Sequence, residues 1–328
     1  MKLKKYLKLA TVVTSLSLVL TGCSTTKEEV KENEKKEDKT ITLVLDRGGI
    51  NDQSFNESSW KGAEKASKDY GVEVKFLESN TEMDYTTNIE NAIDMESDLI
   101  IGIGFNLSEA IEKAAKSYPE QQFAIIDGSF ETVPSNVTSI NFNEKEAGYL
   151  AGIASAKTIK EDKFGFVGGY EVPAVVNYMQ GFEEGLKSVN PNATLLTQYA
   201  NSFTDAAKGR VIAQQLIDQG ASVVVASAGC VNNGIYEICK EKGKYAVAVD
   251  MAQNHIEPKV ILTSAIKKVD VGVSDTIKKF IDGKLEGGTT TIYNILNDGV
   301  GYEQTDLLSQ DTISYVDSII KDKKENNK

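Results

Sequence analysis

From Ile41 to the C-terminus, short apolar runs alternate with stretches of helical periodicity, and this alternation constrains the possible fold more than any other feature. Apolar runs such as Leu99–Phe105 are typical of buried strands. Strands that alternate with helices predict βαβ units, and therefore parallel sheets with helices on both faces. An open sheet rarely exceeds about ten strands. Because this chain has more strand candidates than that, we expect an α/β fold of two doubly wound, Rossmann-like lobes.

A glycine-rich turn joins the first predicted strand to the first predicted helix. Ile41–Leu45 predicts a buried strand, which Asp46 ends. Ser54 and Glu57 have the spacing of a capping box, in which Ser54 caps the helix and Glu57 reaches back to the Ser54 amide. Open α/β sheets bind their ligands where strands end and helices begin. This segment is therefore a candidate for one wall of a binding crevice.

Two aromatic residues occupy equivalent places in the two predicted lobes. Phe55, followed by Asn56, starts the first helix, and Phe203 lies between a predicted strand and the next helix. Two rings that face each other across a cleft would clamp a flat ligand, each contributing about 1–3 kcal/mol by stacking. Ordinary packing of each ring between helix and sheet explains the pattern equally well, so these residues alone leave both interpretations open.

Charged residues follow several predicted strands directly. Asp46, Asp127 and Asp250 each come at the end of an apolar run, and Lys267 lies between a strand and a helix. Strand ends form the ligand-binding edge of such sheets, which favours a shared site. The alternatives are that each carboxylate caps the next helix and that Lys267 is an ordinary surface lysine. Paired carboxylates would also suit a glycosidase, which needs a defined separation that a sequence does not reveal.

Composition excludes several classes of function. The net charge of −12 argues against a nucleic-acid partner, since phosphate binding needs a basic face. His255 is the only histidine, which removes most metal sites and histidine-based triads. Cys230 and Cys239 fit no zinc or redox motif, and we expect both to be small buried hydrophobes. The glycines at 165–169 lack the lysine-serine ending of a phosphate loop. We therefore expect no metal and no cofactor.

The N-terminus has the layout of a secretory signal, with lysines followed by an apolar run too short for a membrane span. Leu20-Thr21-Gly22-Cys23 resembles a bacterial lipobox, in which the cysteine is lipidated and becomes the mature N-terminus. We expect residues 1–22 to be a lipoprotein signal peptide. Residues 23–39 would be the lipidated Cys23 and a disordered tether, because that segment has almost no apolar residue. The expected location is the extracytoplasmic face of the cell membrane, held by the acyl chains alone.

Several segments resemble the basic membrane protein family of bacterial lipoproteins. GGINDQSFNESSWKG at 48–62 is similar to the family signature, and FNEKEAGYLAG at 142–152 and SFTDAAKGR at 202–210 are similar to later segments. The likeness covers essentially all of the chain after the tether. It implies a type I solute-binding protein that captures purine nucleosides, such as guanosine, inosine or adenosine, for an ABC importer.

A type I fold implies a chain that crosses between its lobes three times. We place the crossings near Asn143, near Asp250–Pro258 and near Gly283–Thr289. The first lobe would then comprise residues 40–143 and about 258–285. The second would comprise residues 144–251 and about 288–328.

The resemblance also implies roles for individual residues. Phe55 and Phe203 resemble the rings that sandwich the purine, and Asn56 and Asp127 the pair that reads its polar edge. Asp250 and Lys267 resemble the ribose-hydroxyl ligands. Two residues, Asp46 and Gly229, are expected to line the site, with Tyr178 as a further aromatic. The chain departs from the family pattern at Ala252, where a carboxylate is missing, and around Val231, where the loop has less glycine.

We therefore expect a lipid-anchored, monomeric receptor that delivers a purine nucleoside to an ABC permease and catalyses no reaction. A binding protein for another small solute, such as a sugar, is the main alternative, since sugars also stack on aromatic rings. A nucleoside-processing enzyme that uses Asp46, Asp127 or Asp250 is a rival from another class. An adhesive or signalling surface lipoprotein is a third.

Overall fold

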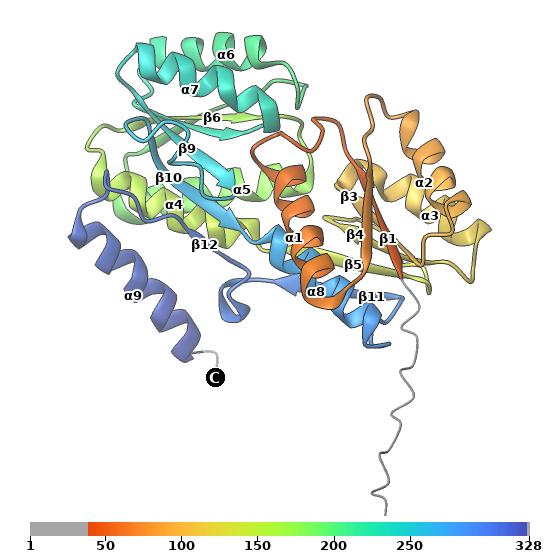
Figure 1. Cartoon of the computed structure of the whole chain (residues 1–328). Coiled ribbons are helices and arrows are strands. Elements are labelled where there is room, and N and C mark those ends of the chain that lie inside the picture. The colour runs from red at the N-terminus through yellow and green to blue at the C-terminus, as the bar shows by residue number, and fades with distance from the viewer. Residues whose placement is uncertain (1–38, 327–328) are drawn as a thin grey trace, which may run out of the picture. The chain divides into compact units, whose positions relative to one another are not determined.

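A computed structural model describes residues 39–326, which belong to one compact unit (Figure 1). The predicted signal peptide, Cys23 and the predicted tether, apart from residue 39, lie outside the described residues. Within residues 39–326, no helix is long and apolar enough to cross a bilayer.

The first lobe is built on a six-stranded, wholly parallel sheet in the order β11-β5-β4-β3-β1-β2. Its strands are β1 (Thr40–Leu45), β2 (Glu73–Leu77), β3 (Leu99–Ile103), β4 (Gln122–Ile126), β5 (Val137–Phe142) and β11 (Thr289–Tyr293). Four helices accompany it: α1 (Phe55–Tyr70), α2 (Asp84–Asp94), α3 (Ser108–Ser117) and α8 (Val269–Ile281).

Alternate side chains of these strands pack on opposite faces of the sheet. Leu43 belongs to the core that includes Ala63 of α1 and Val273 of α8, whereas Val44 packs with Ile89 of α2 and Ile111 of α3. Because both faces are covered, the central strands β1, β3 and β4 are buried along almost their whole length, whereas the edge strands β2 and β11 are partly exposed. The expected doubly wound lobe is therefore confirmed.

The second lobe has a six-stranded sheet in the order β12-β10-β9-β8-β6-β7, parallel except for the edge strand β12. Its strands are β6 (Lys163–Gly168), β7 (Thr194–Tyr199), β8 (Val223–Ser227), β9 (Tyr245–Asp250), β10 (Ile261–Lys267) and β12 (Val300–Tyr302). Its helices are α4 (Glu144–Thr158), α5 (Pro173–Val189), α6 (Ala206–Asp218), α7 (Asn232–Glu241) and α9 (Gln310–Asn326). The pairs α4–α5 and α6–α7 pack against each other, and α9 lies on α4 (Figure 1).

The chain crosses between the lobes three times, but only the first crossing lies where we expected it, at Asn143 between β5 and α4. The second lies at Lys268, because β10 pairs with β9 before α8 returns to α1. The third lies between β11 and β12, at residues 294–299.

The predicted lobe boundaries were therefore wrong for two strands. β10 belongs to the second sheet, not the first, and β11 belongs to the first sheet, not the second. The connection from β9 to β10 contains no helix. In the structure the irregular segment 251–260 makes this parallel connection by itself.

Candidate functional site

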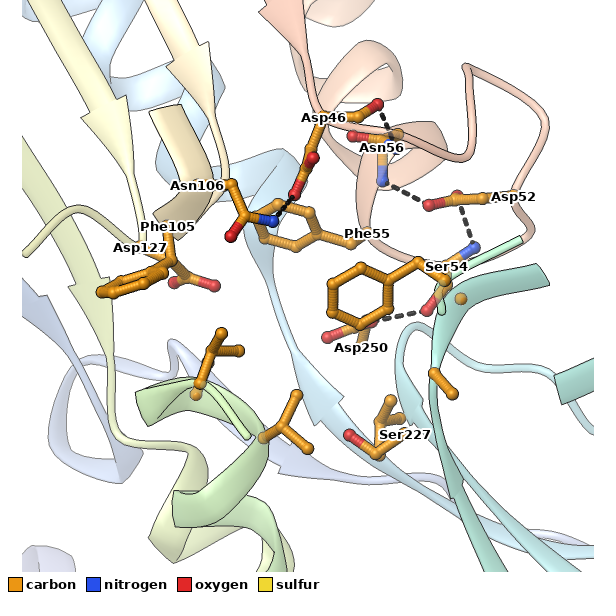
Figure 2. A pocket seen from close by; sticks show the side chains of 18 of the residues that line it. Asp46, Asp52, Ser54, Phe55, Asn56, Phe105, Asn106, Asp127, Ser227 and Asp250 are labelled. Carbon is orange, nitrogen blue, oxygen red and sulfur yellow. Dashed lines mark hydrogen bonds between the residues drawn. The ribbon is translucent and has the colours of Figure 1, made fainter. Parts of the chain in front are cut away.

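One cavity lies where strands of both sheets end, between β1, β3 and β4 of the first lobe and β8, β9 and β10 of the second (Figure 2). The empty space in and around it, including its mouth toward solvent, is about 670 Å³. Its lining includes all nine residues predicted from the sequence: Asp46, Phe55, Asn56, Asp127, Tyr178, Phe203, Gly229, Asp250 and Lys267. Their contacts with a ligand stay predictions.

Two strand-end carboxylates hold matching positions in the two lobes. Asp127 follows β4 with φ 59°, and Asp250 ends β9 with φ 70°. This left-handed conformation is uncommon outside glycine, although aspartate tolerates it better than most residues. It turns the chain sharply at each strand end. Figure 2 shows both carboxylates beside the cavity.

Asp46 is held entirely by its own lobe. Its carboxylate accepts hydrogen bonds from the Tyr85 hydroxyl, from Asn106 Nδ2 at 2.8 Å and from the Arg47 amide at 2.7 Å. Burial raises the pKa of Asp46, while these three hydrogen bonds oppose that rise. Asp46 therefore organises this wall of the cavity and fixes the amide of Asn106 there.

The cap of α1 differs from the capping box that we expected. Ser54 makes no side-chain cap hydrogen bond, and its hydroxyl instead donates to Asp250 in the other lobe. The Asp52 carboxylate accepts the amides of Ser54, Asn56 and Glu57 at 2.9, 3.0 and 3.1 Å. Glu57 forms a salt bridge with Lys61. The capping box was therefore wrong because Asp52, two residues upstream, occupies the helix N-terminus and leaves Ser54 free to face the cleft.

Lys267 sits among three carboxylates, with only 2% of its side chain exposed. Its ammonium forms a salt bridge with Asp127 and another with Glu144 at 3.1 Å. Burial by itself would lower the pKa of Lys267, but Asp127, Glu144 and Asp250 outweigh it and raise that pKa. The interpretation of Lys267 as a surface lysine is wrong. An ammonium has three N–H donors, so one remains for a ligand.

The carboxylates around Lys267 outnumber the ammonium. Burial raises the pKa of Asp127 to about 7, although Lys267 lowers it; repulsion from Glu144 adds to the rise. The pKa of Asp250 is also raised by burial, against the lowering effects of Lys267, Ser54 and Tyr178. Tyr178 contributes its hydroxyl, which donates to Asp250 Oδ1 at 3.3 Å.

Three polar atoms among the cavity residues are buried and have no hydrogen-bond partner within residues 39–326: Arg47 Nε, Asn56 Oδ1 and Asp127 Oδ1. A buried polar group without a partner costs about 1–3 kcal/mol. A ligand that donates to the two oxygens and accepts from the nitrogen would remove that cost. The cavity thus has a defined hydrogen-bonding preference.

Glycines hold the Phe203 ring in place. A Cβ on Gly169 would lie 2.1 Å from the Phe203 ring, so that position has no room for a side chain. Gly229, at φ 59°, allows the amide of Cys230 to donate to the Phe203 carbonyl at 2.9 Å. The other ring, Phe55, belongs to the first lobe, and the Lys267 ammonium of the second lobe is 4.9 Å from its centre. Both rings are half-buried and line the cavity rather than being sealed in a core.

Sequence reasoning missed several cavity residues, among them Arg47, Asp52, Ser54, Phe105 and Asn106. Phe105 and Asn106 follow β3 directly, at the same edge of the sheet as Asp46, and that position was the available signal. It was overlooked because the strand was extended through Phe105. Glu144 lies outside the cavity lining, and the sequence offers no signal for its contact with Lys267.

Within the described residues, no group of His, Cys, Asp and Glu side chains is arranged to hold a metal ion.

Residues 39–328 match the family model described as ABC transporter substrate-binding protein PnrA-like. The chain is 35% identical over 318 residues to the ABC transporter nucleoside-binding protein BmpA of Lactococcus lactis, covering 90% of each chain. It is 34% identical over 289 residues to basic membrane protein D of Borreliella burgdorferi, covering 87% of this chain and 83% of that one.

Among solved structures, an ABC transporter solute-binding protein from Aeropyrum pernix is similar, with a TM-score of 0.80 and 25% identity. The match covers 88% of this chain and 92% of the other. It agrees with the arrangement of two parallel-dominated sheets. The chain therefore belongs to the PnrA-like, basic membrane protein family of ABC transporter substrate-binding proteins.

Proposed function

We propose that this protein binds a purine nucleoside between its two lobes and delivers it to the permease of an ABC importer. The observation that carries the proposal is the pairing of a half-buried ring, Phe55, with two buried, unpaired acceptors beside it, Asn56 Oδ1 and Asp127 Oδ1. A purine ring is flat and carries N–H donors at its edge. Stacking on Phe55 and Phe203 would hold its faces, and the two oxygens would take up its donors.

The second lobe supplies groups suited to a sugar. Asp250 accepts one hydrogen bond on each carboxylate oxygen, from Ser54 and Tyr178, so each oxygen retains a lone pair. Lys267 retains one N–H beside it. A carboxylate and an ammonium together can bond neighbouring hydroxyls, as ribose offers. We therefore assign the ribose to Asp250 and Lys267.

Closure of the two lobes is the mechanism that we propose for capture. The ligand would contact Phe55 and Asn56 on one lobe and Phe203 and Asp250 on the other, so it would stabilise the closed arrangement over an open one. The Ser54–Asp250 hydrogen bond joins the lobes beside the ligand space. The protein would catalyse no reaction.

The named nucleoside-binding relative from Lactococcus lactis supports this ligand class. A plain sugar is the second candidate, because aromatic rings beside Asp250 and Lys267 would suit it as well. The unpaired acceptors beside Phe55 favour the nucleoside, since they match the donors of a base. Lipidation at Cys23, which resembles a lipobox cysteine, would keep the receptor near its permease.

Native mass spectrometry of gently purified protein tests the proposal, followed by titration of the emptied protein with inosine and ribose. We expect a bound mass that corresponds to a purine nucleoside, and binding of inosine but not ribose. A co-purified sugar, or titrations in which ribose binds and inosine does not, would overturn it.

A further inference from the structure

Arg47 bridges the two lobes at the cavity, although no role has yet been assigned to it. It follows Asp46 in the first lobe, where its guanidinium lies 3.3 Å from Glu82 and 4.0 Å from Asp46. Its charged carbon also lies 5.0 Å from the centre of the Tyr170 ring, which belongs to the second lobe. The residue is thus anchored in one lobe and stacked on the other.

Tyr170 also contacts Phe203, the ring that we propose stacks on the base. Its ring meets that of Phe203 edge to face, with centres 5.1 Å apart and planes at 62°. The Phe203 ring also lies so close to Gly169 that this position has no room for a side chain. Arg47, Tyr170 and Phe203 therefore form a continuous line of contact from the first lobe to the ring in the second.

A further contact lies beside Arg47. The Cys230 thiol of the second lobe is 3.6 Å from the carbonyl oxygen of Gly48 in the first. The Arg47 side chain is 20% exposed, and its Nε is buried without an acceptor within residues 39–326. Arg47 also lines the cavity, so that N–H lies among the groups that would surround a ligand.

We propose that Arg47 is a latch and positioning residue: stacked on Tyr170, it holds the lobes closed and seats the Phe203 ring against the ligand. The contact exists only while the lobes are together, so it slows the release of the ligand and hardly affects its entry. Cation–π contacts contribute about 0.5–2 kcal/mol, so its loss should speed release by roughly 2- to 30-fold.

The first arm of the test measures lobe closure and needs no assumption about the ligand. Spin labels at Glu109→Cys on α3 and Glu237→Cys on α7, both exposed, report the distance between the lobes. The background is Cys23→Ser with Cys230→Ser, and Cys239 is buried. Distances are measured by pulsed electron spin resonance with and without inosine. Arg47→Ala and Tyr170→Leu should lower the closed fraction equally, and the double variant should lower it no further.

The second arm measures inosine release by stopped flow and rests on the proposed function. Arg47→Ala and Tyr170→Leu should each raise the release rate and leave the association rate within about twofold, while Tyr170→Phe, which keeps the ring, should behave as wild type. Lys157→Ala is the matched control, because it removes a cation–π contact with Tyr315 that lies wholly within the second lobe.

The latch would be overturned if the substitutions left the closed fraction unchanged. It would also be overturned if the wild type never reached the distance between labels expected for closed lobes. Additive effects of the two substitutions would do the same. Failure of the wild type to bind inosine, with the closed fraction still dependent on Arg47 and Tyr170, would reject the nucleoside proposal and support the latch.

Discussion

The hydroxyl of Ser54, at the start of α1 in the first lobe, donates a hydrogen bond to Asp250, at the end of β9 in the second. Both residues are buried, with 1% and 7% of their surfaces exposed. This contact joins the two walls of the cavity beside the proposed ribose ligands. It also means that the helix cap and the cross-lobe contact are made by different residues, Asp52 and Ser54.

Because Asp52 caps the helix and Ser54 joins the lobes, substitutions at the two positions should have different effects. Asp52→Ala removes the acceptor of three amides, so it should be less stable than Asp52→Asn by about 0.5–2 kcal/mol. Ser54→Ala should change the free energy of unfolding of the empty protein little, and should weaken ligand binding instead. Urea unfolding and titration calorimetry measure the two effects. A stability loss for Ser54→Ala as large as that for Asp52→Ala would instead support Ser54 as the cap of α1.

The two cavity rings should matter more for binding than for stability. Phe55→Ala and Phe203→Ala should each weaken inosine binding by about 1–3 kcal/mol, roughly 5- to 150-fold. Phe182→Ala is the control: this fully buried ring packs on Phe164, so its loss should cost about 3–5 kcal/mol of stability. Calorimetry and thermal unfolding separate the outcomes. Large stability losses with unchanged affinity at Phe55 and Phe203 would mean ordinary packing.

The buried carboxylates predict a stability that falls as pH rises. Burial raises the pKa of Asp52 to about 6 from an unfolded value of 3.8, while three amide hydrogen bonds oppose the rise. Between these values the folded state binds more protons at Asp52, so the contribution of Asp52 to stability is fully present below about pH 4 and is lost as pH rises through 6. Each pKa unit corresponds to about 1.4 kcal/mol, so the ionisation of Asp52 lowers the free energy of unfolding by up to about 3 kcal/mol as pH rises. Asp127, with its pKa near 7, acts in the same direction.

Urea unfolding of the empty protein between pH 4 and 8 measures this effect, with Asp52→Asn as the matched variant. Asparagine keeps one acceptor for the helix amides but does not titrate. The variant should therefore lose less stability than wild type over this range. Parallel pH profiles for the two proteins would show that Asp52 is not the group responsible.

The resemblance of residues 20–23 to a lipobox predicts a lipid anchor at Cys23. Cys23→Ser should leave the protein soluble or unprocessed, because the predicted tether, residues 23–39, has almost no apolar residue of its own. Sedimentation of membranes after salt and carbonate washes, with the unchanged chain as control, measures this. A variant that still sediments with the membranes would contradict the lipid anchor.

The sequence predicted which residues lie together in the cavity better than it predicted the order of the strands, and the reason lies in how each is encoded. Asp46, Asp127 and Asp250 follow apolar strands, and parallel strands bring such ends to one edge, so local patterns suffice to place them together. The lobe to which β10 belongs depends on whether it pairs with β9 or β5. That choice is made by packing between distant segments, which periodicity does not reveal.

Cross-lobe contacts were equally beyond prediction from sequence. Ser54 and Glu57 matched a capping box, yet the Ser54 hydroxyl is taken by Asp250, 196 residues away. Glu144 and Arg47 resemble ordinary surface residues in the sequence. The packing of α4 on β10 within the second lobe brings Glu144 to Lys267, and only the approach of the two lobes brings Arg47 to Tyr170.

The central claim, that the cavity binds a nucleoside through both base and ribose, is tested most directly by calorimetric titration with inosine and hypoxanthine. Asp250 and Lys267 already have protein partners, but without ribose the remaining lone pairs of Asp250 and the third N–H of Lys267 would gain no ligand partner. A hydrogen bond to a charged group contributes about 1.5–3 kcal/mol. Inosine should therefore bind at least tenfold more tightly than hypoxanthine, and Asp250→Ala should narrow that gap by weakening inosine alone. Equal affinity of the wild type for the two ligands would contradict the ribose assignment, and tight binding of ribose itself would contradict the nucleoside.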